Sequence, residues 1–144
     1  MLLGEYDHTI DEKNRLALPA KFRTALAGGV VLTRGLDACV EAYPAHDWQQ
    51  LVESRLAGLN PLSHETRVLQ RFYYTGAVES TPDKQGRVHL PAPLLRHGGL
   101  AKDVTVVGSN DHLEIWDRSV WAERLEGIEG SADNVAQRLA EQHR

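Results

Sequence analysis

A twelve-residue segment that occurs twice in the chain limits its possible folds more than any other feature. DEKNRLALPAKF at residues 11–22 returns as DKQGRVHLPAPL at residues 83–94, with Asp, Arg and Leu-Pro-Ala at matching positions. These matches have an offset of 72 residues, whereas later ones such as Trp48 with Trp121 have an offset of 73, which one extra loop residue explains. Two copies are too few for a solenoid. The repeat therefore predicts two similar half-barrels or sheets within one chain.

Length and composition are those of an ordinary globular protein. The chain has 144 residues, of which 42% are hydrophobic and 25% charged, so it can form one compact unit with a buried core. No apolar run approaches the roughly 18 residues of a membrane span. The start MLLGEYDH lacks the features of a signal peptide. We therefore expect a cytoplasmic protein with no membrane partner.

The cysteine and histidine residues do not form a recognisable metal motif. Cys39 is the only cysteine, which excludes an intramolecular disulfide and a cysteine-based zinc site. It lies in the apolar run CVEAY, where we expect a buried small hydrophobe. The seven histidines are scattered, and none has a partner at helical ligand spacing with a carboxylate companion. The sequence therefore predicts no metal and no cofactor.

Hydrophobic patterning and turn residues predict the same order of elements in each copy: strand, loop, strand, short helix, strand, turn, strand and helix. In the first copy we expect strands at 4–10, 16–18, 30–33 and 39–43 and helices at 19–27 and 45–59. In the second copy the helix at 91–97 precedes strands at 104–107 and 112–116, and Asp117 is expected to cap the last helix. A further helix from Ser63 through Phe72 is expected between the copies.

These elements predict an α+β fold, mainly β, built from two pseudo-repeated ββαββα units with flanking helices. Interleaving the two units into one barrel would remove the exposed edges that each would present alone. The predicted parts are a first repeat at 4–49, a connecting helical segment at 50–75, a second repeat at 76–122, and a C-terminal helical or flexible tail at 123–144.

The aspartate and the arginine that bracket the tight loop are the residues of the repeat best suited to bind a ligand. Asp11 and Arg15 form the first pair, and Asp83 and Arg87 form the second. A local surface ion pair would stabilise the fold by about 0 to 1 kcal/mol. Alternatively, the aspartate aims a guanidinium group outward, where it can bind phosphate or the O6/N7 edge of guanine. The presence of the pair in both copies favours the second interpretation.

The loop between each aspartate and arginine requires a residue that tolerates positive φ. Asn14 fills this position in the first copy, and Gly86 fills it in the second. Both loops are locally basic although the whole chain has a formal net charge of −4. The overall charge argues mildly against general nucleic-acid affinity, but it averages over all faces of the molecule.

Several motifs together resemble the MraZ family of bacterial transcriptional regulators, from about Leu3 to Trp121. They are the paired Asp-x-x-x-Arg loops, the Leu-Pro segments after them, GLD at 35–37 with YP at 43–44 and Trp48, and VVG at 106–108 with EIWD at 114–117. The resemblance implies two SpoVT-AbrB type domains that form a swapped-hairpin, double-psi-like barrel. It also implies a ring of identical subunits that binds double-stranded DNA with short tandem repeats upstream of the division and cell-wall gene cluster, in which the regulator's own gene is usually first.

The same resemblance implies the roles of individual residues. It assigns DNA contact to the loop arginines, Arg15 and Arg87, and orientation of these arginines to the loop aspartates, Asp11 and Asp83. It assigns phosphate contact to the nearby lysines, Lys13 and Lys84. Asn14 stands where the family commonly has glycine, and its amide could add a DNA contact. A ring that presents its loops on one rim would also concentrate basic residues there and match the DNA repeats.

An enzyme and an oligomeric scaffold are the two alternatives to a DNA-binding protein. An enzyme is disfavoured because neighbours such as Asp7 and His8, or Asp111 and His112, are expected to point to opposite faces of a strand. No glycine-rich phosphate loop is present, since Gly28-Gly29 and its later counterpart are typical helix stops. The other alternative is an oligomeric scaffold whose Asp-x-x-x-Arg loops join subunits. DNA binding would weaken steeply with salt, whereas assembly through apolar surfaces would not.

Overall fold

The computed structural model describes residues 1–142, so the last two residues of the predicted tail lie outside the described residues. The first repeat contains β1 (Glu5–Thr9), β2 (Arg15–Ala17), the 3-10 helix η1 (Ala20–Phe22), α1 (Arg23–Leu26), β3 (Val30–Arg34), β4 (Val40–Pro44) and α2 (Ala45–Leu56). Then come α3 (His64–Thr75), β5 (Val78–Ser80), β6 (Arg87–His89), α4 (Ala92–Gly98), β7 (Asp103–Gly108), β8 (Leu113–Asp117) and α5 (Arg118–Gln142). The fold is α+β and mainly β, as the sequence predicts.

Strand pairing interleaves the two repeats. A six-stranded antiparallel sheet has the order β1-β7-β8-β4-β3-β5, and β2 pairs with β6 in a second sheet. Four of the six strand pairs join one repeat to the other, namely β1 with β7, β2 with β6, β3 with β5 and β4 with β8. Each repeat supplies strands that complete the other, so the prediction of an interleaved pair is confirmed.

One hydrophobic core lies between the two sheets. It contains matched residues of the two repeats, such as Leu16 with Val88 and Leu18 with Leu90, all at most 1% exposed. Alternate residues of β4 and β8, including Val40 and Ile115, point into this core. The residues between them therefore point to the other face of the sheet, where Glu41 of β4 contacts α2 and Trp116 of β8 packs against Trp121 of α5.

The short helices follow the proline and glycine residues that the sequence places around them. Pro19 precedes η1 with φ −51°, and Pro91 precedes α4 with φ −62°. Gly99 ends α4 in the left-handed conformation, with φ 60°, and its N–H bonds to the Arg96 carbonyl. The predicted single helix at 19–27 is instead split into η1 and α1. Phe22, which joins them, has φ −103°, outside the α-helical range.

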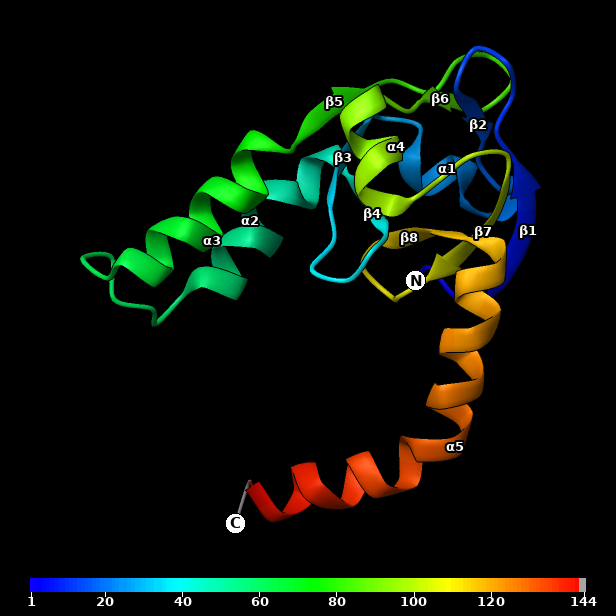
Figure 1. Ribbon diagram of the computed structural model, residues 1–144. Helices are drawn as coiled ribbons and strands as arrows, with labels where there is room; N and C mark the ends of the chain where they lie inside the picture. Colours follow the sequence, from blue (N-terminus) through cyan, green and yellow to red (C-terminus); the bar gives the residue numbers. More distant parts are fainter. Residues whose placement is uncertain (143–144) are drawn as a thin grey trace.

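The helices outside the core form two projections (Figure 1). α2 and α3 lie side by side on one flank of the sheet, and α5 extends away from the strands and bends along its length. Asp117 caps α5 as predicted, since its carboxylate accepts the Val120 N–H at 3.1 Å. The predicted helical or flexible tail is a continuous part of this helix as far as Gln142. No helix among residues 1–142 is both long and apolar enough to cross a membrane.

Candidate nucleic-acid interface

The first loop is organised by the carboxylate of Asp11. Its Oδ1 accepts the backbone N–H groups of Lys13 and Arg15, each at 2.9 Å, and its Oδ2 accepts the Arg15 Nε–H at 2.8 Å. The Asp11 N–H also bonds to the Arg15 carbonyl at 2.9 Å, and the Asn14 N–H bonds to the Asp11 carbonyl at 3.0 Å. One side chain therefore fixes both the backbone of the loop and the direction of the arginine.

The second loop repeats this arrangement. Asp83 Oδ1 accepts the backbone N–H groups of Gln85 and Arg87 at 2.9 Å each, and its Oδ2 accepts the Arg87 Nε–H at 2.8 Å. Asn14 in the first loop has φ 59°, and Gly86 in the second has φ 74°. The sequence-based expectation of positive φ at these two positions is confirmed. The same loop geometry thus holds two arginines, one in each repeat.

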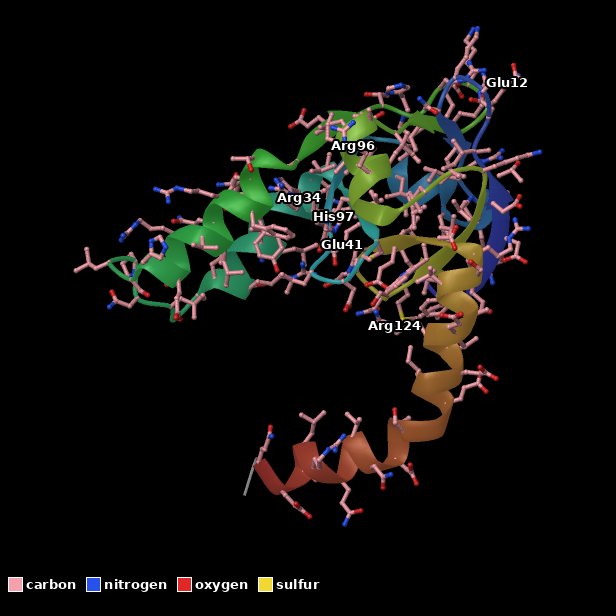
Figure 2. The ribbon with its side chains drawn as sticks, viewed as in Figure 1. Glu12, Arg34, Glu41, Arg96, His97 and Arg124 are labelled. Atoms are coloured by element: carbon pink, nitrogen blue, oxygen red, sulfur yellow. The ribbon has the colours of Figure 1, made fainter. Side chains whose placement is uncertain are left out.

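The two loops lie together because β2 and β6 pair around a pseudo-twofold axis. Arg15 is the register partner of His89, and Ala17 is the partner of Arg87. The loops also exchange hydrogen bonds with the opposite repeat, since the Leu90 N–H bonds to the Asn14 carbonyl at 2.8 Å. Figure 1 shows both loops at one end of the molecule, and Figure 2 shows Glu12 at the tip of the first.

Each arginine keeps its terminal nitrogens available for a ligand. The ion pair to aspartate uses only Nε, and the side chains of Arg15 and Arg87 are 31% and 29% exposed. Within residues 1–142, no hydrogen bond or ion pair involves either pair of Nη atoms of these two side chains. Lys13 and Lys84 are exposed beside them. A fixed guanidinium edge with nearby ammonium groups can bind phosphate or the acceptor edge of a base.

Hydrogen-bond donors lower the pKa of both loop carboxylates. The Arg15 backbone N–H, followed by the Arg15 side chain, lowers the pKa of Asp11, and the Arg87 groups lower the pKa of Asp83 in the same way. A carboxylate with a lowered pKa stabilises the folded loop above its ordinary pKa and loses this effect as pH falls through the lowered value. The arginines therefore stay anchored throughout the neutral and mildly acidic range.

Arg23 is a basic residue that the sequence-based assignment of the interface omits. Its Nε donates to the Leu18 carbonyl at 3.1 Å, and its side chain covers Gly86 of the second loop. A Cβ on Gly86 would lie 2.5 Å from this nitrogen. Comparing the repeats could not reveal that Arg23 packs on the second loop, because its counterpart in the second copy is Leu95. Its place in the basic stretch was the only sequence signal.

Gly86→Ala is expected to destabilise the protein by about 1 to 2 kcal/mol, because an alanine at positive φ is strained and its Cβ would also displace Arg23. Asn14→Gly is the matched control in the first loop and should change stability by less than about 0.5 kcal/mol. Urea unfolding at a fixed protein concentration measures both. Equal stabilities of the two variants would contradict the strained loop conformation.

Comparison with known proteins identifies the family of the chain. The sequence profile of a family described as "MraZ protein, putative antitoxin-like" matches the chain twice, at residues 1–72 and 73–143. The chain belongs to the MraZ family. The boundary between the two matches is consistent with the 72-residue offset of the repeat, so each half of the chain corresponds to one copy of the MraZ family unit.

Similar proteins include several that bear the name "Transcriptional regulator MraZ". The protein from Limosilactobacillus fermentum is 46% identical over 136 residues, which cover 94% of each chain. The protein from Roseiflexus castenholzii is 43% identical over 141 residues, which cover 98% of each chain, and that from Heliobacterium modesticaldum is 42% identical over 96% of each. Membership in a family of regulators confirms the prediction that the chain is not an enzyme.

Proposed function

We propose that this protein is a sequence-specific DNA-binding transcriptional regulator that reads DNA with its two Asp-x-x-x-Arg loops. The observation that carries the proposal is the duplicated anchor: each aspartate holds the Nε of its arginine at 2.8 Å, and the Nη atoms are left outside that ion pair. A surface ion pair alone contributes little stability. Preorganising an arginine in two related loops at one end of the fold instead reduces the entropy cost of binding a ligand there.

The loop residues divide into base-reading and phosphate-binding groups. Arg15 and Arg87 can donate two parallel hydrogen bonds to guanine O6 and N7, which is the commonest specific arginine contact in the major groove. Lys13 and Lys84 reach phosphates on either side, where a point charge suffices. The Asn14 amide adds a donor and an acceptor to the first loop only. The two loops would therefore make similar but not identical contacts with DNA.

The family resemblance supports a ring of identical subunits that acts in the cytoplasm, on the nucleoid. In such a ring, one subunit's paired loops would bind weakly, and several subunits on tandem DNA repeats would bind tightly through effective concentration. The net charge of −4 does not oppose this arrangement, because the acidic residues of α5 extend away from the loops. The target proposed from the resemblance is the promoter region of the division and cell-wall gene cluster, including the protein's own gene.

The proposal predicts DNA binding that depends on both salt and the two arginines. Fluorescence anisotropy should detect binding to DNA from upstream of the protein's own gene, with a slope of about −0.9 in log affinity against log salt for each neutralised phosphate. Arg15→Ala and Arg87→Ala should each weaken binding by about 1 to 3 kcal/mol, which is roughly fivefold to 150-fold.

Arg138→Ala is the matched control, because it removes the same charge from an exposed position on α5. It should leave affinity nearly unchanged, and gel filtration should show the same assembly for all variants. If the loop variants bind as tightly as the control, or if they lose assembly instead of DNA binding, the loops serve an oligomeric scaffold. Gel filtration separates the two cases, because only loops that join subunits would change the assembly when their arginine is removed.

A further inference from the structure

A second pair of matched residues meets where β4 and β8 join the two repeats. Glu41 and Glu114 are related by the 73-residue offset, and they are direct register partners in the antiparallel pair. Their side chains lie on the face of the sheet opposite to the main core. Two like charges directly opposite each other on neighbouring strands destabilise a sheet. The fold therefore places two carboxylates where they need a cation.

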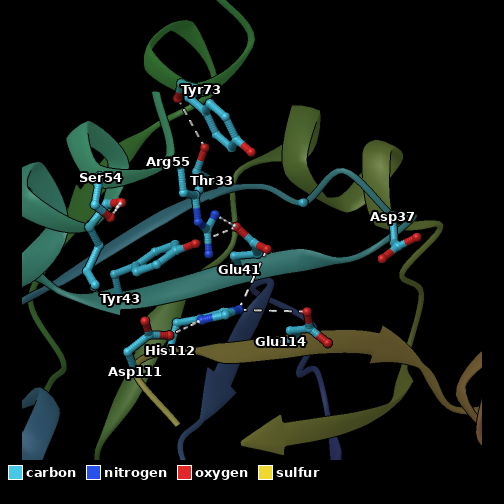
Figure 3. A network of polar contacts seen from close by, with 12 residues as sticks. Thr33, Asp37, Glu41, Tyr43, Ser54, Arg55, Tyr73, Asp111, His112 and Glu114 are labelled. Carbon is cyan, nitrogen blue, oxygen red and sulfur yellow. Dashed lines mark hydrogen bonds and ion pairs between the residues drawn. The ribbon is translucent and has the colours of Figure 1, made fainter. Parts of the chain in front are cut away.

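Each carboxylate has one oxygen held by neighbouring donors and the other turned to a shared point. Glu41 Oε1 accepts the Tyr43 hydroxyl at 2.7 Å and the Arg55 Nη1–H at 3.2 Å. Glu114 Oε1 accepts the Trp116 Nε1–H at 3.1 Å. The two Oε2 atoms each lie 3.7 Å from His112 Nε2 (Figure 3). These donors therefore fix the carboxylates while leaving the inward-facing oxygens to a ligand.

His112 completes the cluster with an unpartnered nitrogen. Its side chain is only 8% exposed, and its ring stacks on Tyr43 with centroids 4.9 Å apart. Nδ1 lies 2.6 Å from Asp111 Oδ1, so this nitrogen is engaged with the Asp111 carboxylate and Nε2 is the ring nitrogen that a metal ion could bind. Across residues 1–142, this buried Nε2 has no hydrogen-bond partner. A buried polar atom without a partner is costly unless something binds it.

The three inward-facing atoms have the spacing of a metal site. One ligand atom from each of His112, Glu41 and Glu114 lies within 4.8 Å of the other two. Ligand atoms at 2.0 to 2.2 Å from a tetrahedral zinc ion are separated by about 3.4 Å. The two nitrogen-to-oxygen separations of 3.7 Å need to close by only a few tenths of an ångström. The two carboxylate oxygens lie within 4.8 Å of each other, so side-chain rotation would bring them closer around the ion.

Charge and access also favour a divalent cation. The carboxylates of the two glutamates and of Asp111, against the guanidinium of Arg55, place two net negative charges around the imidazole ring. The cluster lines a cleft of about 450 Å³ whose wall includes Tyr73 and Leu69 of α3. This volume admits an ion and the water that would be its fourth ligand.

We propose that Glu41, His112 and Glu114 bind a divalent transition-metal ion such as Zn²⁺ at the junction of the two repeats. An imidazole nitrogen with two carboxylates suits zinc and its neighbours better than Mg²⁺, which prefers all-oxygen coordination. The ion would link β4 of the first repeat to β8 of the second and neutralise the facing glutamates. Histidine spacing in the sequence could not reveal this site, because strand pairing supplies its ligands.

The site predicts saturable binding of one Zn²⁺ per chain. Isothermal titration calorimetry of the untagged, metal-stripped protein with zinc chloride should show this stoichiometry, and magnesium chloride should produce no comparable signal. Glu114→Gln and Glu41→Gln should each weaken zinc binding by about a hundredfold or more, and Asp111→Asn by about tenfold to a hundredfold, since it acts through His112. Circular dichroism checks that each variant is folded.

His46→Gln is the matched control, because His46 and Asp47 form an exposed histidine-carboxylate pair with a 3.4 Å contact. It should leave zinc binding unchanged. If a glutamine variant does not fold, anomalous diffraction from zinc-soaked wild-type crystals gives an independent test, with a peak expected between the three side chains. Absence of saturable binding, binding that only His46→Gln reduces, or an anomalous peak elsewhere would overturn the proposal.

Discussion

Leu16→Ala is expected to lower the free energy of unfolding by about 3 to 5 kcal/mol, the range for large cavities in a rigid core. Leu16 is fully buried and is the register partner of Val88 at the pseudo-twofold axis of the β2-β6 sheet. Strands of both repeats surround it, so neither half can move into the cavity without breaking its pairing with the other. Urea unfolding at constant protein concentration measures the loss.

Val120→Ala is the control for this experiment, because Val120 is a hydrophobic residue of α5 that is 40% exposed. Its effect should stay within about 0.5 kcal/mol. The two repeats share one core, so Leu16→Ala should shift a single transition and leave the denaturant dependence unchanged. A loss below about 1 kcal/mol, or a transition that divides into two, would show that the repeats fold as separate units.

The repeat made the interleaved fold predictable from the sequence. An isolated ββαββα unit would expose strand edges, and the matched buried residues of the two copies indicate equivalent positions in one core. The loop geometry was equally predictable, because only Asn or Gly adopts positive φ readily and an aspartate four residues before an arginine can reach it. The loop residues could be interpreted from the sequence because the same short-range pattern occurs twice.

Features that depend on strand register could not be predicted. Asp111 and His112 were expected to point apart as neighbours on a strand, but β8 begins only at Leu113 and the turn lets their side chains meet at 2.6 Å. Nothing in the sequence places Glu41 opposite Glu114, because a one-residue change in pairing would separate them. The prediction of no metal rested on the cysteine count and on histidine spacing along the sequence, and neither can reveal ligands that strand pairing brings together.

The double variant Asp11→Asn/Asp83→Asn is expected to lower the affinity for the specific DNA by about 2 to 6 kcal/mol, the summed discrimination of two arginine-guanine contacts. Asparagine keeps an oxygen for the backbone N–H groups, but its NH₂ group faces the arginine Nε–H where Oδ2 accepted it at 2.8 Å. The arginines keep their charge, but their side chains are no longer held in one orientation. Anisotropy with the specific duplex and with a scrambled duplex, at one salt concentration, measures the effect.

In this variant the change in loop charge and the loss of arginine orientation have opposite effects on DNA affinity, so one experiment distinguishes them. Removing two carboxylates makes the loops more basic, so binding to scrambled DNA should stay equal or increase while specific binding falls. Asp47→Asn/Asp133→Asn makes the same change in net charge away from the loops and should preserve specificity. If the loop variant retained its preference for the specific duplex, the aspartates would not orient the arginines for reading, and the duplicated anchor would serve only the fold of the loop.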